Sequence, residues 1–377
     1  GKNIMKTISK NIVYLGIGLI IFKYNITFSV IKLVPELSTM LMIIGILCFL
    51  PNMISQSYSK KQYIFLIICL TYALINLKNN GDDLILIIVI FSWGLKNIDR
   101  HKMLDVYFIT TGICFTFIIL YSLYTGKGLV LSAAYREENI FVTRYTLGFS
   151  HPNSLQGTYL RIVTSFILSS FCKKNRKRKY FILELINIYL FYLSNSRAGF
   201  IVISIVLLLS FMEDGTVKFL KTRVFCNVML GSIVSVVLFT IYATYNYYKH
   251  SFLIVLNQAI TGRFQHAYKF TSRYSITLLG TDISALSKIF TLDCGIISTL
   301  LKYGIVGSLI ALFVYLYGVK RMWEKKEYTN IIVVLCCVIY SVIESIYVNP
   351  FVNIGLLTCM YSCINYRNTN IKELESV

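Results

Sequence analysis

Long apolar runs recur along the whole chain, and they limit what it can fold into. A helix that crosses a hydrocarbon core of about 30 Å needs roughly 20 mostly apolar residues. We therefore predict an all-α integral membrane protein with about twelve transmembrane helices. They are expected near residues 11–31, 37–55, 62–78, 84–95, 103–124, 153–172, 180–193, 198–212, 224–247, 294–318, 329–348 and 350–366.

The number of helices depends on two places in the sequence. The run at 84–95 is short, and the runs across 180–212 are separated only by SNSRAG, so ten or eleven spans are the alternative. The amino terminus has a basic start but no small-residue cleavage site, which favours a retained first helix. We expect one polytopic membrane domain over residues 1–377, in which residues 1–124 form a scaffold.

Basic clusters between the apolar runs predict the orientation. The strongest is KKNRKRK at 173–179, which the positive-inside rule places in the cytoplasm. Alternation over twelve spans then also puts KTISK, YSKK, KNIDRHK, KFLKTR, KRMWEKK and both termini in the cytoplasm. The longest non-apolar segments, 125–152 and 248–293, become outer loops. The formal net charge of +20 thus indicates the bilayer surface as partner and not nucleic acid.

Several kinds of chemistry lack their sequence motifs. Nearly all of the ten cysteines lie inside apolar runs without CxxC spacing, so we interpret them as small core residues. There is no glycine-rich phosphate loop before a strand, no HExxH and no GxSxG. Nucleotide hydrolysis, zinc proteolysis and serine hydrolysis are disfavoured, and we expect no metal and no cofactor.

A polar stretch with a predicted helix start, YTLGFSHPNSLQGTYLR at 145–161, interrupts the apolar pattern. Pro152 suits the first turn of that helix, and Ser150 or Asn153 can cap it. A helix amino terminus on the outer face attracts anions. The candidate substrate-contacting residues here are Arg144, His151, Asn153 and Arg161. The alternative is a simple helix start with a solvated His151.

Arg197 interrupts what would otherwise be one apolar run, in YLSNSRAGF at 192–200. An arginine at membrane depth costs roughly 2.5 to 3.5 kcal/mol on insertion scales, so it usually faces a polar cavity. The small neighbours, Gly199 among them, favour close approach of the backbone to a ligand. The alternative is a tight outer turn with a snorkelling arginine.

The outer segment ITGRFQHAYKFTSRYSITLLGTDIS is amphipathic and basic. Its candidate ligand-binding residues are Arg263, His266, Arg273 and Asp282. Helical spacing puts Arg263, His266 and Phe270 on one face, which can present cations to a diphosphate. The alternative is a basic helix that lies on lipid headgroups.

Carboxylates stand at the outer ends of two later spans. Asp293 directly precedes the run at 294–318, and Glu344 and Asn349 lie in IESIYVNPFVNIG. A carboxylate there can deprotonate a hydroxyl or bind sugar. Alternatively, Asp293 only complements a helix dipole and Glu344 is a structural hydrogen-bonding partner.

Taken in order, five motifs resemble the Wzy-type repeat-unit polymerases of capsule and O-antigen synthesis. They are LGFSHPNSLQG, LSNSRAGF, ITGRF with LLGTD, LDCGIISTLLKYGIVG and IESIYVNPFVNIGLL, and they cover roughly residues 145–360. The resemblance implies a glycosyltransferase of the bacterial cytoplasmic membrane with its active site outside. It implies inverting, metal-independent transfer of a growing chain from undecaprenyl diphosphate to the next lipid-linked repeat unit. A chain-length regulator and a flippase are the implied protein partners.

The resemblance also implies roles for individual residues. Arg197 and Arg263 correspond to the pair that binds the donor diphosphate. Asp293 is the candidate base for the acceptor hydroxyl, although Cys294 stands where the family often has Asn. His151 competes for the same role, and Asn153 and Glu344 are expected to position the sugar or support the site. A related O-antigen ligase and a flippase or other transporter are the alternative functions.

Overall fold

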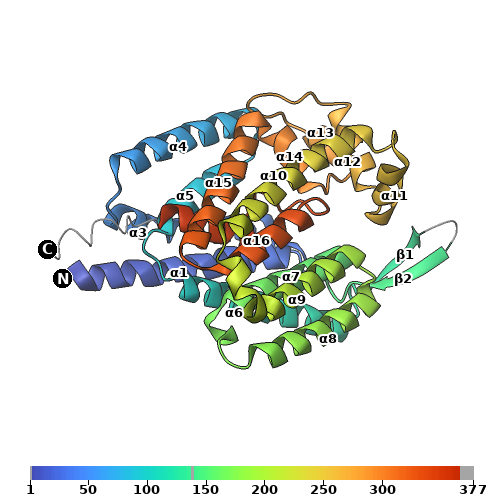
Figure 1. Cartoon of the computed structure of the whole chain (residues 1–377), viewed down its shortest axis with the longest axis horizontal. Helices are drawn as coiled ribbons and strands as arrows, with labels where there is room; N and C mark the ends of the chain where they lie inside the picture. Colours follow the sequence, from blue (N-terminus) through green and yellow to red (C-terminus); the bar gives the residue numbers. More distant parts are fainter. Residues whose placement is uncertain (1, 137–139, 366–377) are drawn as a thin grey trace.

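The computed structural model describes residues 2–136 and 140–365. It is an elongated bundle of helices, with a small β-hairpin projecting from one end (Figure 1). The all-α architecture is therefore confirmed for the described part of the chain, apart from this hairpin. The predicted cytoplasmic carboxyl terminus, from residue 366 on, lies outside the described residues.

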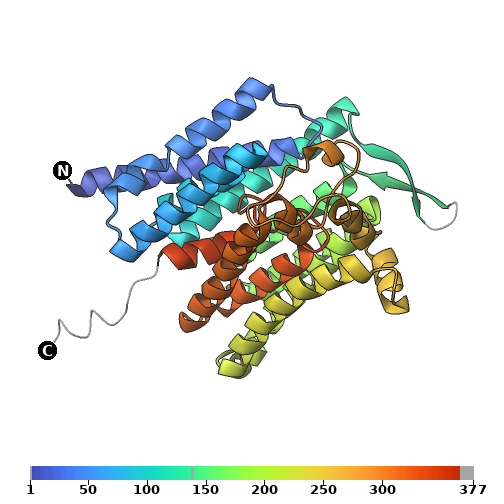
Figure 2. The ribbon, with the colours of Figure 1, turned by 90° about the horizontal axis from the view of Figure 1, so that it is seen from above.

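Helices occupy every predicted apolar run. The first part contains α1 (Lys2–Thr27), α2 (Pro35–Leu47), α3 (Leu50–Ser55), α4 (Lys60–Asn80), α5 (Leu84–Gly94) and α6 (Arg100–Thr125). The second part contains β1 (Val130–Arg136), β2 (Ile140–Tyr145), α7 (Pro152–Leu168), η1 (Ser170–Cys172), α8 (Arg176–Ser194), α9 (Arg197–Leu220), α10 (Arg223–Asn246), α11 (Ser251–Ala259), α12 (Arg263–Thr271), α13 (Ser284–Ser287), α14 (Gly295–Lys302), α15 (Gly304–Glu324), α16 (Tyr328–Tyr340) and α17 (Ile354–Ile364). Figure 2 shows the blue and cyan helices of the first part along one side, and the yellow and orange helices along the other.

Within the described residues, five helical segments are long and apolar enough to cross a membrane. They are Pro35–Ser55, Lys60–Asn80, Arg100–Thr125, Arg223–Asn246 and Gly304–Glu324. Shorter apolar helices are Leu84–Gly94, Tyr328–Tyr340 and Ile354–Ile364. These lengths support a membrane protein, and the twelve-span topology stays a prediction.

The bundle is apolar outside and partly polar inside. Ile113, Phe117 and Leu120 on α6 are each more than half exposed, at 64%, 54% and 59%. By contrast, Asn25 and Thr111 are fully buried, and Asn25 Nδ2 donates to the Ile21 carbonyl at 2.8 Å. A surface of this kind suits lipid tails, while the interior satisfies the polar groups that lipid cannot.

The helix predicted at 294–318 is two helices, α14 and α15. Gly304 at the break has φ of +68°, and a Cβ there would lie 2.5 Å from the Leu278 carbonyl oxygen. The chain preceding α14 crosses the bundle at this point, and the Thr281 amide donates to the Leu301 carbonyl at 2.8 Å. The apolar pattern does not reveal the break, because both halves are apolar.

The β-hairpin between α6 and α7 was not predicted. Its strands are antiparallel, with Val130 opposite Tyr145 and Leu131 opposite Arg144. The register shifts between Leu131 and Ala134. This pairing delivers Arg144 to the amino-terminal end of α7, where the predicted site lies.

Three basic segments that are predicted to face the cytoplasm lie together at one end of the bundle: KNIDRHK, KFLKTR and KRMWEKK. Arg100 forms an ion pair with Glu327, and Trp323 Nε1 donates to the Leu220 carbonyl at 3.2 Å. The hairpin, α11 and α12 lie at the opposite end (Figure 1). This arrangement agrees with the predicted alternation, and which end faces the outside stays a prediction.

Candidate functional site

A cavity at the hairpin end of the bundle collects most of the predicted site residues. Its volume is about 1570 Å³, including the part that is open to solvent. Its walls come from β2, the start of α7, the α8–α9 turn, the α11–α12 turn, and the segments before α14 and after α16. The predicted residues that line it are Arg144, His151, Asn153, Arg197, Arg263, Asp293 and Glu344.

Asn153, in the first turn of α7, joins three parts of the cavity. Its Oδ1 accepts hydrogen bonds from Arg144 and from the Ser196 hydroxyl, both at 3.1 Å. Its Nδ2 donates to Glu344 Oε1 at 3.1 Å. Arg144 is itself held by a 2.8 Å bond from Nε to the Ser194 carbonyl. The side-chain amide of Asn153 therefore holds the Arg144 guanidinium and the Glu344 carboxylate at the same time.

Arg263 is the first residue of α12, and the local backbone fixes its position. Gly262 before it has φ of +76°, which ends the preceding turn in the left-handed region. Asn257 Oδ1 accepts from the Phe264 amide at 3.0 Å and so satisfies one of the free amides of the helix start. The predicted helical spacing in this outer segment is confirmed by α12.

The guanidinium of Arg263 forms ion pairs with both candidate carboxylates, Asp293 and Glu344; the Nη2–Oε1 distance to Glu344 is 3.4 Å. Gly295 lets the two acidic segments meet. Its amide donates to the Ser341 carbonyl at 2.8 Å, and a Cβ there would lie 2.7 Å from the Glu344 carbonyl oxygen. Burial raises the pKa of the Glu344 carboxyl, whereas Arg263 and Asn153 act to lower it.

The ring of His151 caps α7. We expected Ser150 or Asn153 in this role, which is wrong: Nδ1 of His151 accepts from the Asn153 amide at 3.1 Å. Pro152 occupies the first turn as predicted. Because Nδ1 uses its lone pair in this bond, the neutral ring carries its proton on Nε2.

The environment of His151 keeps the ring neutral. Burial is the main cause, and the positive charges of Arg144 and Arg263 add to it, which lowers the pKa to about 4. At neutral pH the ring is therefore a hydrogen-bond donor through Nε2. A hydrogen-bond donor near Arg144 and Arg263 is better suited to bind an anionic or carbonyl oxygen than to remove a proton.

Arg197 begins α9 after the tight turn that follows α8. Asn195 forms this turn with φ of +49°. The side chain of Arg197 is exposed in the cavity and makes no hydrogen bond or ion pair with any residue that the structure describes. Of the small neighbours, Ser196 and Ala198 line the cavity, whereas Gly199 packs against α7: a Cβ there would lie 2.5 Å from the Gln156 side chain.

A buried polar chain behind the cavity supports this turn. The Ser194 hydroxyl donates to Gln156 Oε1 at 3.3 Å, and Gln156 Nε2 donates to Asn187 Oδ1 at 2.6 Å. Asn187 in turn donates to Glu184 Oε2 at 3.2 Å. The sequence could have identified these four residues, because polar side chains inside apolar helices are a recognisable signal. Phe28, which also lines the cavity, gave no such signal.

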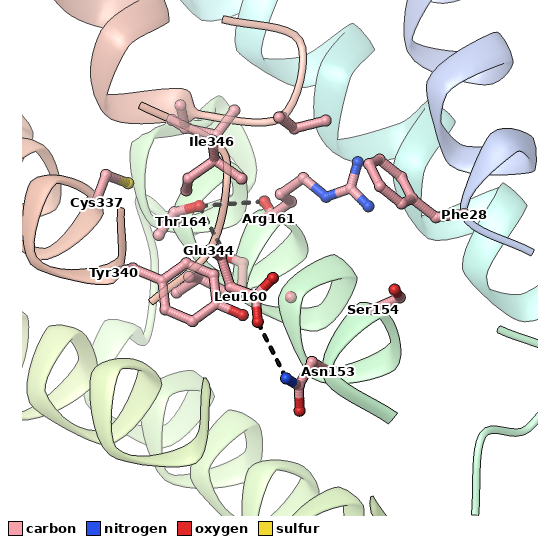
Figure 3. Close-up of a pocket in the computed structure, with 13 residues that line it drawn as sticks. Phe28, Asn153, Ser154, Leu160, Arg161, Thr164, Cys337, Tyr340, Glu344 and Ile346 are labelled. Carbon is pink, nitrogen blue, oxygen red and sulfur yellow. Dashed lines mark hydrogen bonds between the residues drawn. The ribbon is translucent and has the colours of Figure 1, made fainter. Parts of the chain in front are cut away.

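The remaining predicted residues lie elsewhere. Arg161 is buried in a pocket that adjoins the cavity (Figure 3). His266 is on α12 with Nδ1 buried, and Arg273 and Asp282 are exposed on the outer segment. Asn349 Oδ1 accepts from the Phe351 amide at 3.0 Å and shapes the loop before α17.

No group of three or more His, Cys, Asp or Glu side chains in the described part of the chain could hold a metal ion. Comparisons with protein-family models, with curated proteins and with solved structures gave no match to this chain. Any function must therefore be inferred from the residues of the cavity.

Proposed function

We propose that this protein is a glycosyltransferase that polymerises lipid-diphosphate-linked oligosaccharide repeat units, in the manner of the Wzy-type polymerases that its motifs resemble. The observation that carries the proposal is the pair Arg197 and Arg263 in one cavity. Arg197 has no partner among the described residues, and Arg263 is shared between two carboxylates. Two arginines on one cavity suit a diphosphate, because guanidinium groups match its oxygens in forked pairs.

The charge balance of the cavity supports an anionic ligand. Arg144, Arg197 and Arg263 contribute +3, and Asp293 and Glu344 contribute −2, so the lining carries +1 with His151 neutral. A diphosphate that binds Arg263 would draw its guanidinium away from the carboxylates. Binding of the donor would then release the base that the acceptor needs.

The reaction proposed for this cavity is a direct displacement. The acceptor hydroxyl oxygen forms a bond to the anomeric carbon of the donor sugar while the bond to the diphosphate oxygen breaks. The electron pair leaves with the undecaprenyl diphosphate, whose growing charge Arg197 and Arg263 stabilise. The hydroxyl proton passes to a carboxylate of the cavity.

Asp293 is our choice for the base. Its side chain is 29% exposed and faces the cavity, whereas His151 is protonated on its free nitrogen and has a lowered pKa. Glu344 is held by both Asn153 and Arg263, which suits a supporting role.

The test is elongation by the purified protein in detergent, given lipid-linked repeat units and no nucleotide sugar. We expect long products from the wild-type protein and from Arg273→Ala, an exposed arginine outside the cavity, but only single units from Arg197→Ala and Arg263→Ala. Long polymer from either cavity variant would refute the diphosphate role. Transport of the lipid in vesicles without elongation would identify a flippase instead, and transfer of finished chains to another acceptor would identify a ligase.

A further inference from the structure

A second pocket adjoins the cavity and extends along α7 toward the interior of the bundle. The two share Phe28, Asn153, Ser154, Glu344 and Ile346 in their walls. The second pocket has a volume of about 490 Å³, including the part that is open to solvent, and its further walls come from α7, α16 and the start of α17. Arg161, nine residues after the start of α7, lies roughly 13 Å along the helix axis from it.

The guanidinium of Arg161 is only partly satisfied. The residue is 5% exposed, and its Nη2 donates to the Thr158 hydroxyl at 2.6 Å. The Phe28 ring lies beside the guanidinium (Figure 3), and its centroid is 5.1 Å from the guanidinium carbon. Nη1 is buried and has no hydrogen-bond partner among the residues that the structure describes. No carboxylate in that part of the chain forms an ion pair with it.

A buried guanidinium without a carboxylate is unfavourable unless something else neutralises it. The aromatic ring of Phe28 offsets part of the desolvation. Glu344 is the acidic residue in the wall of the pocket, and its carboxylate is already bound by Asn153 and Arg263. Arg161 therefore lies in the wall of this pocket beside Tyr107, and one of its donors, Nη1, has no partner among the described residues.

We propose that this pocket is a binding site for one oxyanion, a carboxylate or a phosphate group, with Arg161 as its main donor. Gly157 keeps the space open, because a Cβ there would lie 3.1 Å from the Tyr340 hydroxyl oxygen. The other walls, such as Leu160 and Cys337, are uncharged. The site does not depend on the proposed transfer reaction, and it would give an acidic group of a ligand a place separate from Arg197 and Arg263.

The experiment measures thermal unfolding of the purified full-length protein titrated with inorganic phosphate, with glucuronate and with glucose. It is run in an Arg263→Met background so that the outer cavity contributes less. We expect phosphate or glucuronate, but not glucose, to raise the Tm. Adding Arg161→Met should weaken the apparent affinity for phosphate or glucuronate roughly tenfold or more, which is the usual effect of losing a charge-assisted hydrogen bond. Arg161→Lys should retain part of it, and Arg273→Met should change nothing.

A parallel arm uses vesicles with and without phosphatidylglycerol, to learn whether the oxyanion arrives on a lipid. A shift that requires the anionic lipid and is lost in Arg161→Met supports a lipid phosphate, and a shift with the soluble anions supports a free or sugar-borne group. If Arg161→Met binds every probe as the parent does, the inference is overturned. It is also overturned if no probe shifts the Tm and Arg161→Met merely stabilises the protein, because Arg161 is then a structural charge.

Discussion

Arg263 and Asp293 form an ion pair across the cavity although 30 residues separate them in the chain. Arg263 is the first residue of α12 and Asp293 lies two residues before α14, so two separate helix starts hold the pair together. In the proposed reaction these residues have opposite tasks, one on the diphosphate and one on the acceptor hydroxyl. Their pairing keeps both from acting until a stronger anion competes for Arg263.

Asp293→Asn should separate binding from transfer. Removing the Asp293 carboxylate leaves Arg263 with Glu344 alone as its acidic partner, so the protein should bind inorganic diphosphate more tightly than the wild type. Transfer should fall by roughly 10²- to 10⁴-fold, the usual contribution of a general base. Initial rates of elongation and a diphosphate titration check the two effects. Unchanged elongation would exclude Asp293 as the base.

Asn153→Ala should destabilise the cavity. It removes the side-chain bonds to Arg144, Ser196 and Glu344 and leaves partly buried charged groups less satisfied. We expect a loss of about 1 to 3 kcal/mol in the free energy of unfolding, with elongation reduced as well. Thermal unfolding measures the first effect. Ser154→Ala, on the next residue of the same turn, is the control and should stay near the wild-type value.

His151 should make the stability depend on pH in the acid range. Its pKa is lowered to about 4 in the folded protein, from an ordinary value of 6.5. The unfolded chain therefore binds the proton first, and the stabilisation is present above pH 6.5 and is lost as the pH falls through 4. Between these values the Tm of the wild type should fall more steeply than that of His151→Gln. Glu344, whose pKa is raised, has the opposite dependence but is present in both proteins. Parallel curves would show that His151 is not held neutral.

Gly295→Ala should push the two acidic segments apart. The new Cβ would lie 2.7 Å from the Glu344 carbonyl oxygen and 3.0 Å from that of Ser341. These are backbone atoms, which cannot move aside without distorting the chain. We therefore expect a loss of about 1 to 3 kcal/mol in the free energy of unfolding, and weaker elongation. Gly112→Ala on α6 is the matched control, because no atom lies within 4 Å of its new Cβ. Equal Tm values for both variants would contradict the close packing at Gly295.

Apolar run length predicted where the helices lie, because crossing a bilayer imposes a length that the sequence displays directly. The charge pattern and the alternation of spans placed the polar segments on one face, which is why Arg263, Asp293 and Glu344 could be predicted to lie near one another. Their partners could not be predicted. The bond from Asn153 to Glu344 spans 191 residues, and only the packing of α7 against α16 determines it. The break between α14 and α15 at Gly304 could not be predicted for a related reason. It depends on a distant backbone segment that crosses there, and the apolar pattern of the helix does not record that segment.

The crossing at Gly304 bears on how a ligand reaches the cavity. Amides of Thr281 and Ile305 bond to carbonyls of Leu301 and Thr277 at 2.8 and 3.0 Å, which ties the outer segment to the bundle downstream of Arg263. Upstream, Asn257 joins α11 to the start of α12. The segment that carries Arg263 is thus hydrogen-bonded to its neighbours on both sides. If the protein acts on lipid-linked sugars as proposed, we expect the size of the branch points on the sugar, and not the opening of a gate, to limit what the protein accepts.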